Sequence, residues 1–419
     1  MGYFYRKNGV LWCEGVEVED IAYKYGTPLY LYSSSFIRDR FIEYKESFSW
    51  ISSKICYSIK ANSNISICSM LARLGAGADV VSGGEIYRAL KAGFNPQDIV
   101  FAGVGKREEE IRYALENGIL LINVESYPEL LLLNSIAMEM GIKARAGIRI
   151  NPALDTELHP HVSTGARDSK FGIELEFAEE VIKLAAREME GLEVIGLHIH
   201  IGSQITEVDP FIEGTEKLLG LFRRLKAGGV DIRYLDVGGG LGIDYGNDDG
   251  LPSPSMLSDV LRPLLSGIGG VTVILEPGRS IVGKGGILLT KVLYVKKTPV
   301  KDFVIVDAGM NDFIRPSLYG SYHRIIPVRE REGKRIKADV VGPVCESGDF
   351  LGKGREMVEP EPGDILAVMD AGAYGFTMSS NYNSRPRPAE VMVKGSEVFL
   401  IREREGYEDL IDKERMVEL

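Results

Sequence analysis

The stretch KICYSIKA, residues 54–61, is the first of eight short runs rich in Val and Ile that decide the fold. The later runs are GADVVS, DIVFAG, LLINVE, ARAGIRIN, EVIGLHIH, IRYLDVGG and VTVILEPG. Between them lie segments such as REEEIRYALENG, whose apolar residues recur every three or four positions, as in amphipathic helices. Eight strand–helix units in succession predict a (β/α)₈ TIM barrel, an α/β fold. A doubly wound sheet is the alternative, because alternation alone does not show that the sheet closes.

The pattern changes after Arg279. The next strand-like runs are GGILLTKVLYVKK, DFVIVDAG, ADVVGPVCES, DILAVMDAGAY and EVFLIRER, with turns between them. This is typical of a mostly antiparallel β domain, which the strand-like N-terminal stretches GVLWCEGVEV and PLYLYS are expected to join. We therefore expect an N-terminal segment over 1–35, a barrel over 36–280 and a C-terminal β domain over 281–419. The final stretch, REREGYEDLIDKERMVEL, is predicted to be a charged surface helix.

Composition excludes several classes of protein. The 419 residues are 45% hydrophobic and 26% charged, as in ordinary globular proteins, and the net charge of −11 argues against nucleic acid or an anionic membrane as main partner. The four cysteines form no CxxC pair, which argues against a zinc site or a disulfide framework. The start, MGYFYRKNGVLW, lacks the apolar core of a signal peptide, and no apolar run reaches membrane-spanning length. We therefore expect a cytoplasmic protein.

Lys60 comes at the end of the first run. In strict alternation it shares one side of the strand with Cys56 and Ser58. A lone lysine at a strand end is ordinarily a surface group, whose stem packs while its ammonium meets water. In a TIM barrel, however, the active site lies at the C-terminal ends of the strands. The fold therefore predicts that Lys60 lies at the rim where chemistry takes place.

Three further motifs follow later strands. His198 and His200 share one parity in LHIHIGS; taken alone they are interpreted as structural, because no Asp, Glu or Cys nearby completes a metal-ligand set. The glycines of DVGGGLG, residues 236–242, do not match a Rossmann fingerprint, but they let backbone N–H groups approach an anion. EPGR brings Glu276 and Arg279 after the eighth run, and the loops after strands seven and eight are the usual phosphate site of this barrel.

One rim is thus expected to hold a lysine, a phosphate cradle, two imidazoles and a carboxylate. A small cofactor with an aldehyde, a phosphate and a protonatable ring nitrogen would use all of them. Pyridoxal 5′-phosphate (PLP) has these features, and a lysine Schiff base is its expected setting. The residues therefore predict that Lys60 holds PLP.

At these residues the chain resembles the fold-type III PLP-dependent decarboxylases with an alanine racemase-like barrel, and among them the diaminopimelate decarboxylase family. The motifs that carry the resemblance are YSIKAN, HIHIGSQ, DVGGGLGIDY, EPGRSIV, DAGMNDFIRPSLY, GPVCESGD, AGAYGFTMSSNYN and REREGYEDLI. One departure is Ser58, where many relatives have a small aliphatic residue. The resemblance implies decarboxylation of meso-2,6-diaminopimelate to L-lysine and CO₂, the last step of lysine biosynthesis. It also implies a homodimer with active sites at the interface.

The resemblance assigns several residues to the cofactor. It implies that Lys60 would hold PLP, His200 would stack on the ring and Glu276 would face the pyridine nitrogen. Around the phosphate, or in the loops that form its site, would lie Ser203, Gly239, Gly240, Gly278 and Arg279. Near the cofactor would also lie Asp79, Arg149 and, from the partner subunit, Tyr374.

For the substrate the resemblance implies contacts with Arg279, Arg315, Tyr319, Glu346 and Tyr374. It makes Cys345 the catalytic proton donor, with Cys345 and Glu346 reaching across the dimer. Arg315 and Glu346 suit a substrate with a second amino-acid head, because arginine pairs with a carboxylate and glutamate with an ammonium group. A glutamate at 276, where racemases of this barrel type have arginine, favours a decarboxylase, because it keeps the pyridine nitrogen protonated.

Several alternatives stay open. Within the class, the chain could be a decarboxylase of ornithine, arginine or carboxynorspermidine. Outside it, the chain could be a non-catalytic PLP carrier or regulatory homologue, or a cofactor-free barrel in which Lys60 is structural. His159 and His161 are predicted to be surface or loop groups. His323 in YGSYHR is near the predicted substrate loop, but the sequence gives it no role.

Overall fold

The computed structural model describes residues 3–154, 169–246 and 250–418, so His159 and His161 lie outside the described residues. It divides into two compact units. The barrel unit comprises Arg38–Ile243 and Asp249–Ser280. The β unit comprises Met1–Ile37, Asp244–Asp248 and Ile281–Leu419.

The barrel unit is built on a closed ring of parallel strands. In chain order these are β5 (Ser53–Ser58), β6 (Gly77–Val80), β7 (Ile99–Phe101), β8 (Leu121–Val124), β9 (Ala144–Asn151), β11 (Leu192–His198), β12 (Tyr234–Asp236) and β13 (Thr272–Leu275). Each strand pairs with the next, β13 pairs with β5, and the short β10 (Ile173–Glu174) adds to β9. Because β8 also pairs with β9, the ring is continuous. The predicted TIM barrel is confirmed, and the alternative of a doubly wound sheet is wrong.

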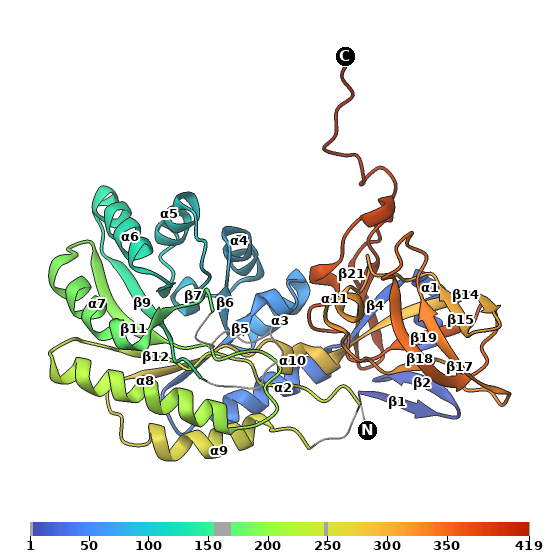
Figure 1. Cartoon of the computed structure of the whole chain (residues 1–419), viewed down its shortest axis with the longest axis horizontal. Coiled ribbons are helices and arrows are strands. Elements are labelled where there is room, and N and C mark those ends of the chain that lie inside the picture. Colours follow the sequence, from blue (N-terminus) through green and yellow to red (C-terminus); the bar gives the residue numbers. More distant parts are fainter. Residues whose placement is uncertain (1–2, 155–168, 247–249, 419) are drawn as a thin grey trace. The chain divides into compact units, whose positions relative to one another are not determined.

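Helices lie around the outside of the barrel strands (Figure 1). They are α3 (Ile65–Arg73), α4 (Gly83–Ala92), α5 (Glu108–Glu116), α6 (Tyr127–Met140), α7 (Leu175–Glu188), α8 (Asp209–Ala227) and α9 (Pro254–Leu265), and α2 (Ser34–Ser47) precedes β5. Their amphipathic pattern explains the arrangement, since α7 buries Ala178, Ile182 and Ala185 and contacts β9 and β11. N-cap serines fix where two helices begin: Ser82 Oγ accepts the N–H of Glu85, and Ser126 Oγ that of Glu129.

The β unit contains two sheets. The larger consists of β4 (Leu29–Ser33), β14 (Gly286–Lys297), β15 (Asp302–Val306), β16 (Ile325–Pro327), β17 (Arg335–Val341), β18 (Phe350–Val358), β19 (Ile365–Val368), β20 (Ala389–Lys394) and β21 (Glu397–Arg402). The smaller consists of β1 (Phe4–Lys7), β2 (Val10–Cys13) and β3 (Val16–Glu17). Its short helices are α1 (Val18–Tyr25) and α11 (Arg315–Tyr319), and α10 (Arg279–Val282) precedes β14. Among the described strands of this unit, only β15–β17 and β4–β20 pair in parallel.

The N-terminal segment belongs to the β unit, as predicted. Strand β4 lies between β14 and β20 in the larger sheet. Leu11 and Leu31 pack in one buried apolar cluster with Ile287 and Leu289 from β14. Burial of this shared core, which removes apolar surface from water, ties the two ends of the chain into one unit.

Two expectations for the β unit were incomplete or wrong. Strands β1, β16, β18 and β20 were not predicted; in β18 the charged residues and two glycines of FLGKGREMV obscure the strand pattern. The predicted C-terminal helix is absent from the described residues up to 418, which form turns after β21. Tyr407 and Ile411 there are 80% and 61% exposed, and a short segment that buries no apolar face does not hold a helix. Among the described helices, none has the length and apolar character needed to cross a membrane.

Candidate active site

Lys60 lies just beyond the C-terminal end of β5. The strand ends at Ser58, and a single 3₁₀ turn, η1 (Ile59–Ala61), carries the lysine, so the predicted alternation stops two residues before it. Lys60 Nζ lies 2.8 Å from Oδ2 of Asp79 on β6. Asp79 is fully buried, so its carboxylate holds the partly exposed amine in one place.

Ser58, the departure from the family pattern, ties three strand ends together. Its Oγ lies 2.6 Å from Asp79 Oδ2 and 2.9 Å from the carbonyl oxygen of Glu276. Gly278 packs against the same turn, because a Cβ at this position would lie 2.9 Å from the Cβ atoms of both Ser58 and Ala61. The predicted residue Gly278 therefore lets the loop after β13 approach the turn that carries Lys60.

Glu276 follows β13 and is buried. Its Oε2 lies 3.4 Å from Nε2 of His198 and 3.6 Å from Nδ1 of His200. Burial alone would raise the pKa of Glu276. The two histidines and the charge of Lys60 lower it by more than burial raises it, so its pKa falls well below the usual range. Glu276 is therefore ionised, and its Oε1 has no hydrogen-bond partner among the described residues.

His198, His200 and Glu276 also form a possible ligand set for a metal ion. One donor atom of each lies within 4.8 Å of the others. The sequence-based statement that no acidic residue completes the histidine pair is therefore wrong, because the third donor comes from a different strand end. The same three groups could instead surround a protonated ring nitrogen, which needs one ionised carboxylate.

Asp236, at the end of β12, lies next to this carboxylate. Its Oδ1 accepts the backbone N–H of Gly238 at 2.9 Å, and its Oδ2 lies 3.4 Å from Nδ2 of Asn123. Burial and the negative charge of Glu276 raise the pKa of Asp236 well above its usual range. Of the two buried carboxyl groups, Glu276 is therefore the stronger acid and Asp236 the weaker one.

The predicted glycine loop lies between three strand ends. A Cβ at Gly239 would lie 2.0 Å from the carbonyl oxygen of Glu276, and one at Gly240 would lie 2.2 Å from that of Gly202. Gly240 also has a φ of 104°, which favours glycine. Only glycines allow these loops to approach so closely.

Two predicted phosphate residues meet beside this loop. Arg279 Nη2 lies 3.0 Å from Ser203 Oγ. The N–H of Gly239 donates to Nδ1 of His200 at 3.3 Å. Burial together with the charge of Lys60 lowers the pKa of His200, which favours a neutral imidazole.

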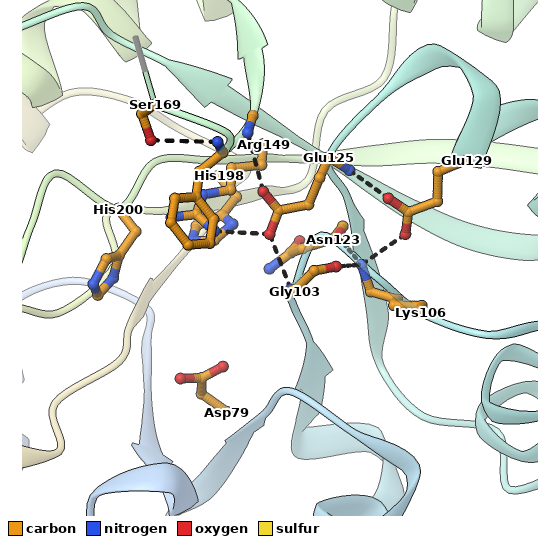
Figure 2. Close-up of polar contacts among 12 residues, drawn as sticks. Asp79, Gly103, Lys106, Asn123, Glu125, Glu129, Arg149, Ser169, His198 and His200 are labelled. Atoms are coloured by element: carbon orange, nitrogen blue, oxygen red, sulfur yellow. Dashed lines mark hydrogen bonds and ion pairs between the residues drawn. The ribbon is translucent and has the colours of Figure 1, made fainter. Parts of the chain in front are cut away.

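A second polar network at the rim was missed by the sequence reasoning, except for Arg149 (Figure 2). Arg149 Nη1 lies 2.7 Å from Oε1 of Glu125, the residue that follows β8, and both are buried. Lys106 Nζ donates to Glu129 Oε1 at 2.7 Å, and Glu129 Oε2 accepts the N–H of Glu125 at 2.9 Å. Glu125 directly follows the buried run LINV, so the positional argument made for Lys60 could have found it.

Four of the predicted substrate residues, Arg315, Tyr319, Glu346 and Tyr374, lie in the β unit, whereas Arg279 belongs to the barrel unit. Arg315 and Tyr319 are on α11, with the Arg315 guanidinium 5.8 Å from the centre of the Tyr319 ring. Cys345 and Glu346 are exposed in the turn between β17 and β18, outside any core, as the sequence CESGD predicts. Tyr374 follows β19 with a φ of 56°, a left-handed conformation unusual for tyrosine.

Three polar side chains hold the turn of Cys345. Asn383 Oδ1 accepts the N–H of Cys345 at 2.7 Å, and Asp349 Oδ2 accepts the N–H of Val344 at 2.7 Å. Ser317 of α11 donates its hydroxyl to the carbonyl of Gly348 at 2.5 Å. The turn is thus fixed to the helix that carries Arg315, although its side chains are exposed. In the β unit the structure thus brings the turn of Cys345 and Glu346 to the helix of Arg315 and Tyr319.

Comparison with known proteins identifies the family. Residues 34–283 match the family described as "Pyridoxal-dependent decarboxylase, pyridoxal binding domain". Over 410 residues the chain is 50% identical to diaminopimelate decarboxylase of Aquifex aeolicus, covering 98% of this chain and 97% of the relative. This chain belongs to the diaminopimelate decarboxylase family of PLP-dependent decarboxylases.

Solved structures of the family agree along the whole chain. The diaminopimelate decarboxylase of Helicobacter pylori, complexed with L-lysine, is 47% identical with a TM-score of 0.90, covering 94% of this chain and 98% of that one. The enzyme of M. jannaschii, also with L-lysine, is 42% identical with a TM-score of 0.94, covering 99% and 98%.

The barrel residues fit the cofactor of this family, PLP. Lys60 supplies the amine, and the glycine loop beside Ser203 and Arg279 suits a phosphate. Buried Glu276 Oε1 and Asp79 Oδ1, which have no hydrogen-bond partners among the described residues, can accept from donors on a ligand. A ring nitrogen opposite an ionised carboxylate explains the His198–His200–Glu276 cluster without a metal.

Proposed function

We propose that this chain decarboxylates meso-2,6-diaminopimelate to L-lysine and CO₂, the last step of lysine biosynthesis. The observation that carries the proposal is one rim on which Lys60, 2.8 Å from buried Asp79, lies together with the buried, ionised Glu276. These groups suit PLP chemistry in which a substrate carboxylate leaves as CO₂. The choice of substrate rests on the family and on the two relatives solved with L-lysine.

The barrel residues would hold and polarise the cofactor. Lys60 Nζ would bind it through its aldehyde, and Asp79 would keep that nitrogen charged and in place. Glu276 would hold a proton on the pyridine nitrogen, because a desolvated carboxylate pairs strongly with a protonated ring. When bound, PLP supplies an electron sink for the electron pair left behind as CO₂ departs.

The loops around these groups would complete the cofactor site. Neutral His200 would lie against the ring face, where an uncharged imidazole does not weaken the pairing between Glu276 and the ring. The phosphate would be held by Ser203, Gly239, Gly240, Gly278 and Arg279. Backbone N–H groups and an arginine are the usual anion ligands in this position of the barrel.

The β unit would supply the proton and the substrate contacts. Cys345 Sγ would deliver a proton to the carbon that lost CO₂, from a turn whose backbone is held by Asn383. Arg315 would pair with the far carboxylate of the substrate and Glu346 with its far ammonium group. Further substrate contacts are proposed for Arg279, Tyr319 and Tyr374.

We further propose a homodimer in which Cys345, Glu346 and Tyr374 of one subunit serve the lysine of the other. Exposure of Cys345 and Glu346 supports this, since a proton donor in open water would be poorly shielded. Functionally, residues 36–280 would form the PLP-binding domain, and 1–35 with 281–419 the second domain. A cytoplasmic location is proposed from the four cysteines, all of which are free.

The test is CO₂ release by the PLP-loaded protein from meso-diaminopimelate, ornithine, arginine and lysine, each supplied separately. Release from meso-diaminopimelate alone, with L-lysine as product, is the expected result. Release from ornithine or arginine would preserve the reaction type but remove the role given to Arg315 and Glu346. A protein that binds PLP and acts on none of the four would instead be a carrier or regulatory homologue.

A further inference from the structure

Arg315 is buried and contacts three uncharged polar groups. Its Nε lies 3.4 Å from Nε2 of His323, and its Nη2 lies 3.3 Å from both Tyr245 OH and Ser321 Oγ. All these residues belong to the β unit. The contacts to Arg315 direct its guanidinium without themselves supplying negative charge.

His323 is fully buried, and its surroundings fix its protonation pattern. Nδ1 lies 2.9 Å from the carbonyl oxygen of Met369, which can only accept, so this nitrogen carries the hydrogen. Nε2 then presents a lone pair to the N–H of Arg315. A doubly protonated ring would place N–H against N–H and a positive charge beside the guanidinium, so the geometry selects the neutral ring.

Aromatic packing fixes the orientation of the His323 ring beside Arg315. Phe313 packs edge-on against His323 with ring centres 4.6 Å apart, and Tyr245 does so at 4.8 Å. Tyr245 therefore touches both His323 and Arg315, whose guanidinium lies 5.5 Å from the centre of its ring. The arginine is held by a group of side chains that are themselves locked in position.

We propose that His323, with Tyr245, is a positioning pair that aims Arg315 at the far carboxylate of the substrate. The inference rests on the proposed function and extends it, because the sequence left His323 without a role. His323 and Tyr245 would fix the direction of the guanidinium through contacts that add no negative charge of their own. The site would therefore distinguish amino acids that keep a far carboxylate from diamines that have none.

The test compares binding of L-lysine and 1,5-diaminopentane to the PLP-loaded protein by calorimetry. L-Lysine keeps the carboxylate that Arg315 would hold, and the diamine lacks it. His323→Asn retains a donor near the Nδ1 position but cannot reach Arg315, so we expect L-lysine to bind about tenfold more weakly and the diamine unchanged. His323→Gln places an acceptor near the Nε2 position and is expected to restore L-lysine affinity to within about threefold of the wild type.

Tyr245→Phe is the second variant, because it keeps the aromatic packing and removes only the hydroxyl. It should weaken L-lysine by about threefold to tenfold, again without affecting the diamine, even where His323→Asn does not fold. Equal loss of both ligands, or a glutamine variant no better than the asparagine one, would overturn the positioning role. So would unchanged L-lysine affinity in His323→Asn. CO₂ release by the wild type from meso-diaminopimelate is measured separately, so failure of the proposed function is distinguished from failure of this inference.

Discussion

The barrel rim contains buried carboxylates, whereas the turn of Cys345 in the β unit has exposed polar side chains. In the barrel, Asp79 and Glu276 are buried and lie in contact with Lys60 and the histidines of neighbouring strand ends. In the β unit, Cys345 and Glu346 are exposed, although the backbone of their turn is fixed. Buried charges need partners within the fold, whereas exposed groups on a turn do not.

This difference agrees with the proposal that the site is divided between two subunits. On the barrel side the charges are compensated and close glycine contacts fix the loops, which suits the proposed cofactor site. The exposed turn has a defined backbone but its side chains face water, which suits a surface that works only when covered. We expect substitutions on the two sides to differ in kind: loss of cofactor binding in the barrel, and loss of turnover with cofactor retained in the β unit.

Lys60→Ala should have the largest effect. The variant loses the amine that holds PLP, so we expect no measurable CO₂ release and no absorbance of lysine-bound cofactor. The matched control is Lys54→Ala, at the opposite end of the same strand, where the lysine pairs with Asp98. That variant should keep both absorbance and turnover; equal loss in the two variants would mean that Lys60 has only a structural role.

Cys345→Ala should come next. Because a positioned proton donor typically contributes ~10²–10⁴-fold, kcat should fall by that factor while PLP binding, followed by absorbance, is unchanged. Ser347→Ala, on the same exposed turn, is the control and should retain activity. A near-normal kcat in Cys345→Ala would remove this cysteine from the mechanism.

Arg315→Ala should reduce kcat/KM for meso-diaminopimelate by about 10–100-fold, since a charge-assisted contact with the far carboxylate is lost. Cofactor loading should be unaffected. Arg331→Ala removes a surface arginine paired with Glu361 and should leave kcat/KM unchanged. Parallel loss of PLP and activity in Arg315→Ala would instead indicate a structural role.

The smallest effect concerns stability at the barrel rim. Burial raises the pKa of Glu85 on α4 to about 7. The folded state therefore keeps a proton that the unfolded chain releases, and this contribution to stability is lost as pH rises from about 4.5 through 7.

Glu85→Gln cannot ionise, so its Tm should fall less between pH 5 and pH 8 than that of the wild type, by on the order of 2 °C. The matched control is Glu116→Gln, at the exposed end of α5, which should follow the wild-type curve. Identical pH dependence in the wild type and Glu85→Gln would contradict the raised pKa.

Sequence reasoning recovered the fold class because each barrel strand is a compact apolar run between helices of clear period. Closure depends on the pairing of β8 with β9, which no local pattern records. Local rules failed where tertiary contacts decide: the charged C-terminal stretch has helical composition but no surface against which to pack.

The candidate site was accessible to sequence reasoning only in part. Motifs with an unusual composition, such as the glycine run, identified their own loops. Contacts between distant segments could not be predicted in this way. Examples are the ion pair of Glu125 with Arg149 and the short distance between Glu276 and His198. The tautomer of His323 likewise depends on the carbonyl of Met369, which becomes its neighbour only in the folded chain.

The most direct test of the account mixes Lys60→Ala and Cys345→Ala subunits under conditions that allow exchange, and measures CO₂ release from meso-diaminopimelate. If a lysine from one subunit and a cysteine from the other serve one site, mixed dimers regain one intact site. Activity should then rise to about one quarter of the wild type, because random exchange makes half of the dimers mixed. A mixture no more active than its two components, with exchange verified by native mass spectrometry, would contradict the shared site.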